Sequence, residues 1–424
     1  MCTIVPTVVY SPNFLCMIKR SERLNSVSYD LCGPIYEKAK ELEQQGHRVT
    51  KLNIGNPAPF GFDAPREVTE RIVLNLQHAQ GYSDHKGLLS AREAVKRYYE
   101  GKGIGNIHTE DIYLGNGLSE LIIQAVQGLL NDGDEVLVPS PDYPLWTAAV
   151  RFAGGNAVHY TCDEEAEWFP DVADIKSKLT SRTRALVIIN PNNPTGAVYS
   201  KELLQELVKL AEEHNLVIFS DEIYDKILYD NTPYTSVATL SDKVLFVTFS
   251  GLSKNTLAAG FRAGWMLVSG AKSKASSYMD GLNTLASLRV CSNVPAQYAI
   301  EVALEGPQTI YDLTKPTGRL GQQRMISYEK LTAIPGITCV KPKGAFYMFP
   351  KLDVKQFNIH DDQQFALDLL TEQHVLLVQG SGFNWHKPDH FRVVYLPEAE
   401  VLTKTLDKLT LFLQTYRQHD QVLV

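Results

Sequence analysis

The segment VLFVTFSGLSKNTLAAGFRAGWMLV, residues 244–268, contains two short apolar runs joined by a polar, glycine-containing loop. The runs at 244–249 and 265–268 are bounded by polar or turn residues, a pattern typical of strands buried on both faces of a sheet. Lys254 lies in the loop between them. Similar runs predict further strands earlier in the chain, at 135–138, 185–189 and 216–219.

A helix is predicted between the last two of these earlier strands. Residues 201–214 place their apolar side chains on one helical face, namely Leu203, Leu204, Leu207, Leu210 and Ala211. A strand, a helix and a strand in this order indicate an α/β fold with a largely parallel sheet. A second helix is predicted at 118–130, where apolar residues recur with helical spacing after the turn Gly115-Asn116-Gly117.

The pattern changes after residue 293, which predicts a smaller α+β domain. Helices are expected at 296–304 and 319–332, and short strands at 345–349 and 391–394. A helical pattern over 24–45 suggests that the N-terminal region packs with this second domain. We therefore expect a loose N-terminal extension at 1–20 and an N-terminal segment at 21–64 that packs with the small domain. The large domain is expected at 65–300 and the small domain at 301–424.

The composition favours a globular protein with small-molecule partners. In 424 residues, 41 Lys and Arg oppose 48 Asp and Glu, and no basic run offers nucleic acid an electrostatic contact. No apolar stretch reaches the roughly 18 residues that cross a bilayer. The six cysteines include no C-x-x-C pair that would suggest zinc, so we expect free thiols in a reducing cytoplasm. The first 16 residues lack the pattern of a signal peptide and are expected to be dispensable, with Met17 as an alternative start.

Several reactive side chains follow the predicted strands, at the edge where open α/β sheets bind ligands. Lys254 follows one strand, and its amine is a candidate nucleophile if it is held partly desolvated. Taken alone, a Ser-Lys pair in a loop is better explained as an exposed lysine. Asp221 ends another strand and is placed to face a cationic ring nitrogen, although it is also a candidate helix cap. Tyr224 follows Asp221 by three residues.

Other candidates point to anion binding. Asn193 lies in Asn190-Pro191-Asn192-Asn193-Pro194, a rigid turn at a strand end or simply a turn. Gly117, Leu118 and Ser119 open a predicted helix, whose N–H groups and dipole suit a phosphate, although a lone Gly-x-Gly more often serves structural packing. Arg262, predicted to begin a strand, and Arg392, within one, have apolar neighbours and favour a bidentate anion or a structural salt bridge.

In this order and spacing, the residues resemble the class I and II aminotransferases of the fold-type-I pyridoxal-phosphate enzymes. The resemblance covers about residues 20 to 415. The segments Leu52-Asn53-Ile54-Gly55-Asn56-Pro57-Ala58-Pro59-Phe60 and Tyr143-Pro144-Leu145-Trp146 are most similar to the alanine (glutamate–pyruvate) branch.

The resemblance implies that Lys254 carries the pyridoxal 5'-phosphate as a Schiff base, that Asp221 pairs with the ring nitrogen, and that Tyr224 and Asn193 bind the ring oxygen. Tyr143 would stack on the ring. The phosphate ligands implied are Gly117, Leu118, Ser119, either Ser250 or Ser253, Arg262 and, from the neighbouring subunit of a homodimer, Tyr82. The residues implied at the substrate are Arg392 for the α-carboxylate, helped by Gly55 and Asn193, and Tyr29 over the pocket.

The chain departs from the family pattern at two places. Many relatives have arginine at the position of Cys32, and an aromatic-arginine pair where this chain has Asn255-Thr256-Leu257-Ala258. The first departure concerns substrate choice and the second the geometry of a loop.

The resemblance implies ping-pong transamination between amino acids and 2-oxo acids, with alanine, pyruvate, glutamate and 2-oxoglutarate as substrates and products. The same fold supports carbon–sulfur β-lyases, which would release ammonia and pyruvate without a second oxo acid. A regulator that only senses the cofactor is a third alternative, and the chain lacks the basic helix-turn-helix region such a protein would use.

Overall fold

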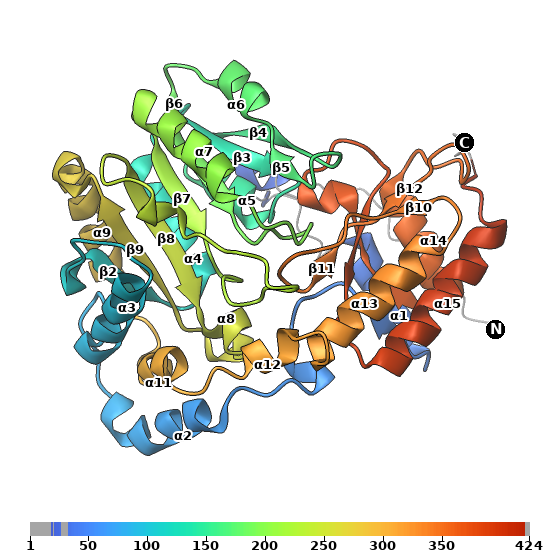
Figure 1. The fold of residues 1–424 in the computed structure, drawn as a ribbon, viewed down its shortest axis with the longest axis horizontal. Helices are drawn as coiled ribbons and strands as arrows, with labels where there is room; N and C mark the ends of the chain where they lie inside the picture. Colours follow the sequence, from blue (N-terminus) through green and yellow to red (C-terminus); the bar gives the residue numbers. More distant parts are fainter. Residues whose placement is uncertain (1–17, 20, 27–32, 420–424) are drawn as a thin grey trace, which may run out of the picture.

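The computed structural model describes residues 18–19, 21–26 and 33–419. The expected N-terminal extension therefore lies largely outside the described residues, as do Tyr29 and Cys32. Two bodies of structure lie side by side, a large one around an extended sheet and a smaller one at the C-terminal end of the chain (Figure 1).

An eight-stranded sheet forms the centre of the large body, in the order β2-β9-β8-β7-β6-β3-β4-β5. Strands β3, β4, β6, β7 and β8 are parallel, which confirms the predicted α/β fold with a mostly parallel sheet. The strands are β2 Ile112–Gly115, β3 Glu135–Ser140, β4 Asn156–Asp163, β5 Phe169–Pro170, β6 Thr183–Ile189, β7 Val217–Asp221, β8 Leu245–Gly251 and β9 Gly264–Gly270.

Strand β9 is antiparallel to both of its neighbours, β8 and β2. The connection from β8 contains only the four-residue helix α8 (Leu252–Asn255) and the 3-10 turn η7 (Ala259–Phe261). A parallel crossover usually needs a dozen or more residues and a helix that packs back over the sheet. The chain therefore turns back after β8 and runs antiparallel beside it as β9, with Lys254 in the turn between the two strands.

Side chains alternate between two apolar layers along each buried strand, as the two-residue period of a strand requires. On β6, Ala185, Val187 and Ile189 pack with α4, α5 and α9, whereas Leu186 and Ile188 pack on the opposite face with α7 and α3. These helices are α3 Leu89–Gly101, α4 Leu118–Leu129, α5 Leu145–Phe152, α7 Lys201–Glu213 and α9 Ser276–Leu288. The predicted helices at 118–130 and 201–214 correspond to α4 and α7.

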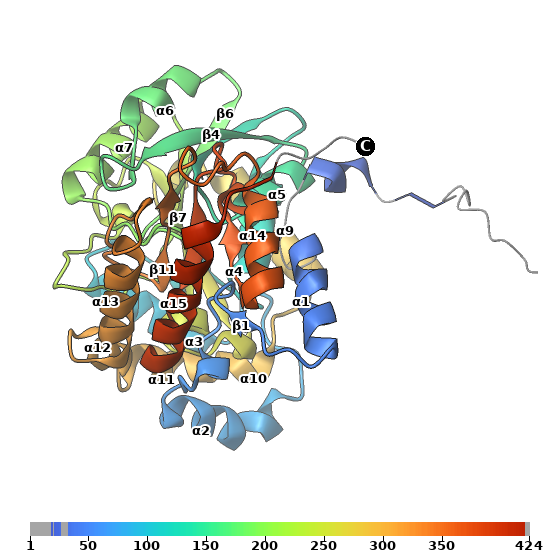
Figure 2. The same ribbon diagram turned by 90° about the vertical axis from the view of Figure 1, so that its right-hand side faces the viewer.

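Helices α13, α14 and α15 cover the smaller body, and the N-terminal helix α1 packs against α14 (Figure 2). Strand β1 pairs in parallel with β13, and the sheet β11-β15-β14 lies beside them. The bounds are α1 Pro34–Gln44, α13 Arg319–Thr332, α14 Asp362–Gln373, α15 Ala399–Thr415, β1 Thr50–Lys51, β10 Ile337–Thr338, β11 Tyr347–Met348, β12 Lys351–Leu352, β13 Val375–Leu376, β14 Val378–Gln379 and β15 Phe391–Val394.

Two predicted helices differ in the structure. The helix expected over 24–45 begins only at Pro34, because proline suits the first helical position and the extended Gly33 precedes it; Glu22–Ser26 form a separate 3-10 turn. The helix expected over 296–304 is divided into α10 (Val294–Gln297) and α11 (Ala299–Glu305), and α11 packs against α2 and α3. The remaining helices are α2 Arg66–Asn75, α6 Val172–Lys178 and α12 Ile310–Thr314. None of the described helices is both long and apolar enough to cross a membrane.

Candidate active site

A cavity of about 340 Å³ lies where the carboxyl ends of β6 and β7 meet the N-terminus of α4 and the smaller body. This position agrees with the general rule for ligand sites in open α/β sheets. Eleven of the predicted site residues line it: Gly55, Leu118, Ser119, Tyr143, Asn193, Asp221, Tyr224, Ser253, Lys254, Arg262 and Arg392.

The amine of Lys254 is held within this cavity by the backbone. Its Nζ donates a hydrogen bond to the carbonyl oxygen of Gly55 at 2.5 Å. Gly55 follows β1 and packs so closely that a Cβ atom there would lie 2.1 Å from Tyr347 Oη. A side chain at position 55 would displace Tyr347, so glycine lets this carbonyl approach the lysine.

Asp221 is buried at the end of β7, beside Asn190 across the sheet and Phe249 on β8. Its carboxylate accepts hydrogen bonds from Trp146 Nε1 and from the amide of Ile223, both at 3.3 Å. Burial raises the pKa of Asp221 to about 6, and these two hydrogen bonds only partly oppose the shift. The carboxylate is therefore ready to pair with a cation that enters the cavity. It ends a strand and caps no helix, since a turn follows.

Two tyrosines meet on the side of the smaller body. Tyr224 Oη and Tyr347 Oη lie 2.7 Å apart in a hydrogen bond, and both side chains are buried. Burial raises the pKa of Tyr224, which keeps its hydroxyl protonated and able to donate.

Arg392 is buried on β15 and already oriented. Its Nη1 donates to Asn193 Oδ1 at 2.8 Å, and its Nη2 donates to the carbonyl oxygen of Asn53. Its guanidinium carbon lies 4.5 Å from the ring centres of both Tyr347 and Phe383. This fixed, planar cation suits a carboxylate, which guanidinium binds through two parallel hydrogen bonds.

The first turn of α4 and Arg262 lie together in an arrangement suited to an anion site. Gly117 has φ 85°, and a Cβ atom there would lie 2.2 Å from Arg262 Nη2. Arg262 does not begin a strand as predicted; it occupies the left-handed region at φ 55°, two residues before β9, and donates to the carbonyls of Ala259 and Asn116. Its guanidinium thus lies beside Gly117, the residue that precedes α4.

Ser250 and Tyr82 do not line this cavity. Strand β8 continues through Gly251, so Ser250 points to the face opposite Phe249, where its hydroxyl donates to the carbonyl of Glu222 at 3.4 Å. Ser253, beyond the strand, lines the cavity instead. Tyr82 is 85% exposed.

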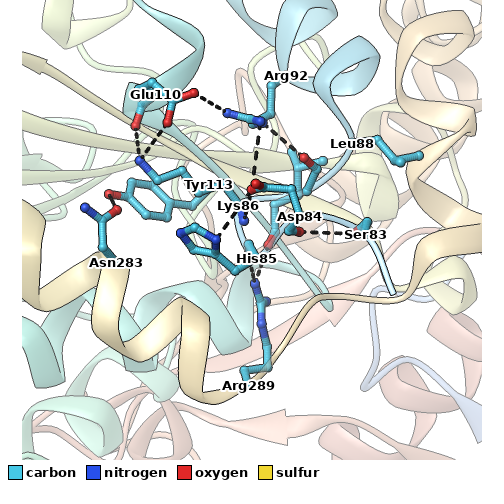
Figure 3. Close-up of polar contacts among 12 residues, drawn as sticks. Ser83, Asp84, His85, Lys86, Leu88, Arg92, Glu110, Tyr113, Asn283 and Arg289 are labelled. Atoms are coloured by element: carbon cyan, nitrogen blue, oxygen red, sulfur yellow. Dashed lines mark hydrogen bonds and ion pairs between the residues drawn. The ribbon is translucent and has the colours of Figure 1, made fainter. Parts of the chain in front are cut away.

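The loop that follows Tyr82 is held by a network of charged side chains (Figure 3). The amide of Lys86 donates to Asp84, and Arg92 bonds Glu110 at 3.0 Å. Arg289 donates to the carbonyls of His85 and Leu114 through one nitrogen and to Glu120, on the first turn of α4, through another. The Tyr82 loop and the anion site are therefore joined through one arginine.

Sequence reasoning missed several residues of the cavity. The lining includes Asn53, Tyr347, Val378, Gly382 and Phe383, and Trp146 on α5, which is not part of the lining, donates a hydrogen bond to Asp221. The motif Tyr143-Pro144-Leu145-Trp146 could have pointed to Trp146, and the predicted strand at 345–349 could have pointed to Tyr347. In the described part of the chain, no cluster of His, Cys, Asp and Glu is arranged to hold a metal ion.

Comparison with known proteins gives the class of protein. The family described as aminotransferase class I and II matches residues 47–409. The chain therefore belongs to the class I and II aminotransferases.

Within this family, the chain is 57% identical to the glutamate-pyruvate aminotransferase AlaA of Escherichia coli, over 95% of this chain and 99% of that protein. It is 54% identical to an alanine aminotransferase of Mycobacterium tuberculosis, over 94% and 93%. Among solved structures, an aminotransferase from Escherichia coli superimposes with a TM-score of 0.94 at 57% identity, covering 95% of this chain and all of that one. An alanine aminotransferase from Pyrococcus furiosus gives 0.89 at 37% identity, covering 93% and 100%.

Proposed function

We propose that this aminotransferase uses pyridoxal 5'-phosphate to convert alanine and 2-oxoglutarate into pyruvate and glutamate. One observation carries the proposal: a lysine amine, a buried carboxylate and a buried arginine converge on one cavity beside an anion site. The similarity to proteins named glutamate-pyruvate and alanine aminotransferases supports the choice of substrates.

The residues present fit this cofactor. The first turn of α4, Ser253 and Arg262 would hold a phosphate, and Tyr143 lines the wall where a flat ring would stack. Asp221, with its pKa raised by burial, would gain a partner in a protonated ring nitrogen. When bound, pyridoxal phosphate supplies a cationic ring that accepts the electron pair left when the substrate Cα–H bond breaks.

The protein's own residues then bind the substrate and move protons. Arg392 binds the α-carboxylate of the amino acid, with its orientation already set by Asn193 and the Asn53 carbonyl. Lys254 accepts the Cα proton and later returns a proton, acting as general base and general acid. Asp221 keeps a proton on the ring nitrogen, and Tyr224 and Asn193 donate to the ring oxygen. A 2-oxo acid leaves before the second one enters, which is ping-pong transamination.

A half-reaction screen tests the proposal. The cofactor-loaded protein is mixed with each of the twenty amino acids, and the change in cofactor absorbance is followed without any oxo acid. We expect alanine to react among the fastest and to yield pyruvate in an amount equal to the protein sites. Catalytic release of ammonia and pyruvate from a cysteine conjugate, with no second oxo acid, would instead identify a carbon–sulfur β-lyase.

Cys32 leads to a prediction about substrate range. Among the described residues that line the cavity, the cations are Lys254, Arg262 and Arg392, and Cys32 lies outside the described residues. If the relatives' arginine at this position binds a distal carboxylate, a thiol cannot replace a contact worth about 1.5–3 kcal/mol. The glutamate half-reaction should then be slower than that of alanine, and Cys32→Arg should raise kcat/KM for glutamate about tenfold while leaving alanine nearly unchanged.

The matched control for this prediction is Cys32→Ser, which changes the thiol without adding a cation and should leave both substrates unaffected. Stopped-flow half-reactions with alanine and glutamate provide the measurement. A protein that already prefers glutamate over alanine, and gains nothing from Cys32→Arg, would contradict the idea.

We also propose a cytoplasmic homodimer in which Tyr82 reaches the phosphate at the partner's site. Support comes from the 85% exposure of Tyr82 and from Leu288 and Val290, which are 77% and 45% exposed on either side of Arg289, the residue that binds the Tyr82 loop. Exposed apolar side chains of this kind often mark interfaces. The described cysteines, Cys162, Cys291 and Cys339, are free thiols, as a reducing compartment favours.

Mixed dimers test this arrangement. Lys254→Ala protomers should be inactive, and Tyr82→Phe protomers should bind the cofactor weakly. In a hybrid, one site carries both changes and the other carries neither, so adding excess Lys254→Ala protein should raise the activity of Tyr82→Phe protein at limiting cofactor. If verified subunit exchange brings no rise, Tyr82 serves its own subunit. Wild-type protein diluted with the same excess provides the control.

A further inference from the structure

A second group of charged side chains lies outside the cavity, next to Lys254. Asp225 is buried four residues after Asp221, and its Oδ2 accepts hydrogen bonds from Lys102 and, at 2.5 Å, from Tyr98 Oη. Lys102 Nζ also lies 3.6 Å from Glu222 Oε2. The proposed function assigns no role to Lys102, Asp225 or Glu222.

This group is connected to the catalytic lysine through Asn255. Asn255 Nδ2 donates to Asp225 Oδ1 at 2.5 Å, and its Oδ1 accepts from the amide of Lys226 at 3.3 Å. Lys254 and Asn255 are consecutive in α8, where neighbouring side chains point about 100° apart. When Asn255 is fixed toward Asp225, the direction of the Lys254 side chain into the cavity is fixed as well.

The turn that carries Lys254 needs such an anchor. Helix α8 has four residues, too few to be stable alone. Leu257, two residues after Asn255, is buried in the left-handed region at φ 59°, a conformation that persists in a residue other than glycine only when its surroundings impose it. The amide of Leu257 donates to the carbonyl of Lys254 at 3.1 Å, so the strained residue and the lysine belong to one turn.

The anchor itself is stable because its charges are paired. Burial alone would raise the pKa of Asp225, but attraction to Lys102 and the hydrogen bonds from Lys102 and Tyr98 lower this pKa below its ordinary value. The carboxylate therefore stays ionised and accepts strongly from Asn255. The ring centre of Tyr98, 4.6 Å from Lys102 Nζ, adds a further attraction.

We propose that Asn255, held by the Lys102–Asp225 pair, is a positioning residue that sets the direction of the Lys254 amine. This inference rests on the proposed role of Lys254 in binding the cofactor and transferring the proton. Because Asn255 lies outside the cavity, its loss should change the placement of the amine and leave substrate binding by Arg392 intact.

The test compares Asn255→Ala with the unaltered holoenzyme and with Gln308→Ala. Asn255→Ala removes the link and leaves Lys102 paired with Asp225. Gln308 binds the Lys226 side chain at 2.5 Å, so Gln308→Ala loosens the same segment without touching Asn255 or Asp225. The first readout is the share of bound cofactor that borohydride fixes to Lys254, measured by mass spectrometry. The second readout is the pair of values kcat and KM for alanine, measured separately.

For Asn255→Ala we expect a lower borohydride-fixed share and a kcat reduced about ten- to a hundredfold, with KM within about twofold, because a misplacement near 1 Å costs this much. Gln308→Ala should stay within about twofold in every readout, and Asn255→Ser, whose hydroxyl can still reach toward Asp225, should fall between. The inference is overturned if Asn255→Ala matches the unaltered enzyme or if Gln308→Ala lowers both readouts equally. Failure of the unaltered enzyme to attach cofactor at Lys254 would instead overturn the proposed function.

Discussion

Lys254→Ala should lower the rate of transamination at least about 10⁴-fold, because the variant would lose the amine that we propose as both the covalent anchor of the cofactor and the general base. The amine is the group that the Gly55 carbonyl holds inside the cavity. Removing a nucleophile that also transfers protons typically costs more than removing either role alone, since the remaining residues cannot take over. Single-turnover reaction with alanine, followed by cofactor absorbance, measures the loss.

Borohydride provides the matching chemical test. In the unaltered protein, reduction should attach the cofactor to Lys254 and to no other lysine, and the adduct should disappear in Lys254→Ala. The exposed Lys201, at the start of α7, offers a control, because Lys201→Ala should keep both activity and adduct. An adduct on a different lysine would show that the assignment is wrong.

Asp221→Asn should stabilise the protein without cofactor at pH 8 while lowering its activity by about a hundredfold. The pKa of Asp221 in the folded protein is about 6, above its ordinary value of 3.8. Folding therefore favours the protonated carboxyl of Asp221. The stability that this preference adds to the folded protein is fully present below pH 3.8 and is lost as the pH rises through about 6. A difference of roughly two units corresponds to about 3 kcal/mol, which asparagine does not lose because it cannot ionise.

Urea unfolding of the cofactor-free proteins measures this effect. At pH 8 the free energy of unfolding of the variant should exceed that of the unaltered protein, and the difference should shrink toward zero as the pH falls to 4. Saturating cofactor should reverse the order at pH 8, because only the carboxylate gains a cationic partner. An equal stability of the two cofactor-free proteins at pH 8 and pH 4 would contradict the assignment of a costly buried charge.

Local patterns predict those parts of the site that follow directly from strand ends. Asp221 ends a buried strand, Lys254 and Asn193 follow two others, and the parallel sheet brings the three to one edge. Trp146 and Tyr347 escaped prediction because their contacts with Asp221 and Tyr224 arise from packing between distant elements. No local rule relates such positions.

Other differences have a local backbone cause. Ser250 and Ser253 could not be separated because the sequence does not reveal that β8 extends through Gly251, which turns Ser250 to the opposite face. Arg262 was predicted to begin the strand after Lys254, yet it adopts a left-handed conformation that arginine rarely takes outside tight turns. At the N-terminus, the apolar spacing suggested one long helix, whereas Pro34 starts a new one.

The bond from Arg392 to the Asn53 carbonyl joins residues 339 positions apart, and β1 pairs with β13 over a similar span. During synthesis, the stretch around Asn53 therefore leaves the ribosome long before its partners exist. At 5–20 residues per second, the delay is about 20–70 s. The large sheet, with Lys254 and Asp221, is complete once β9 ends at Gly270, about 6–24 s before Arg392 is made, whereas the side of the cavity that contains Arg392 closes only after translation has passed that residue. The residues that we propose for the cofactor are thus made before the arginine that we propose for the substrate.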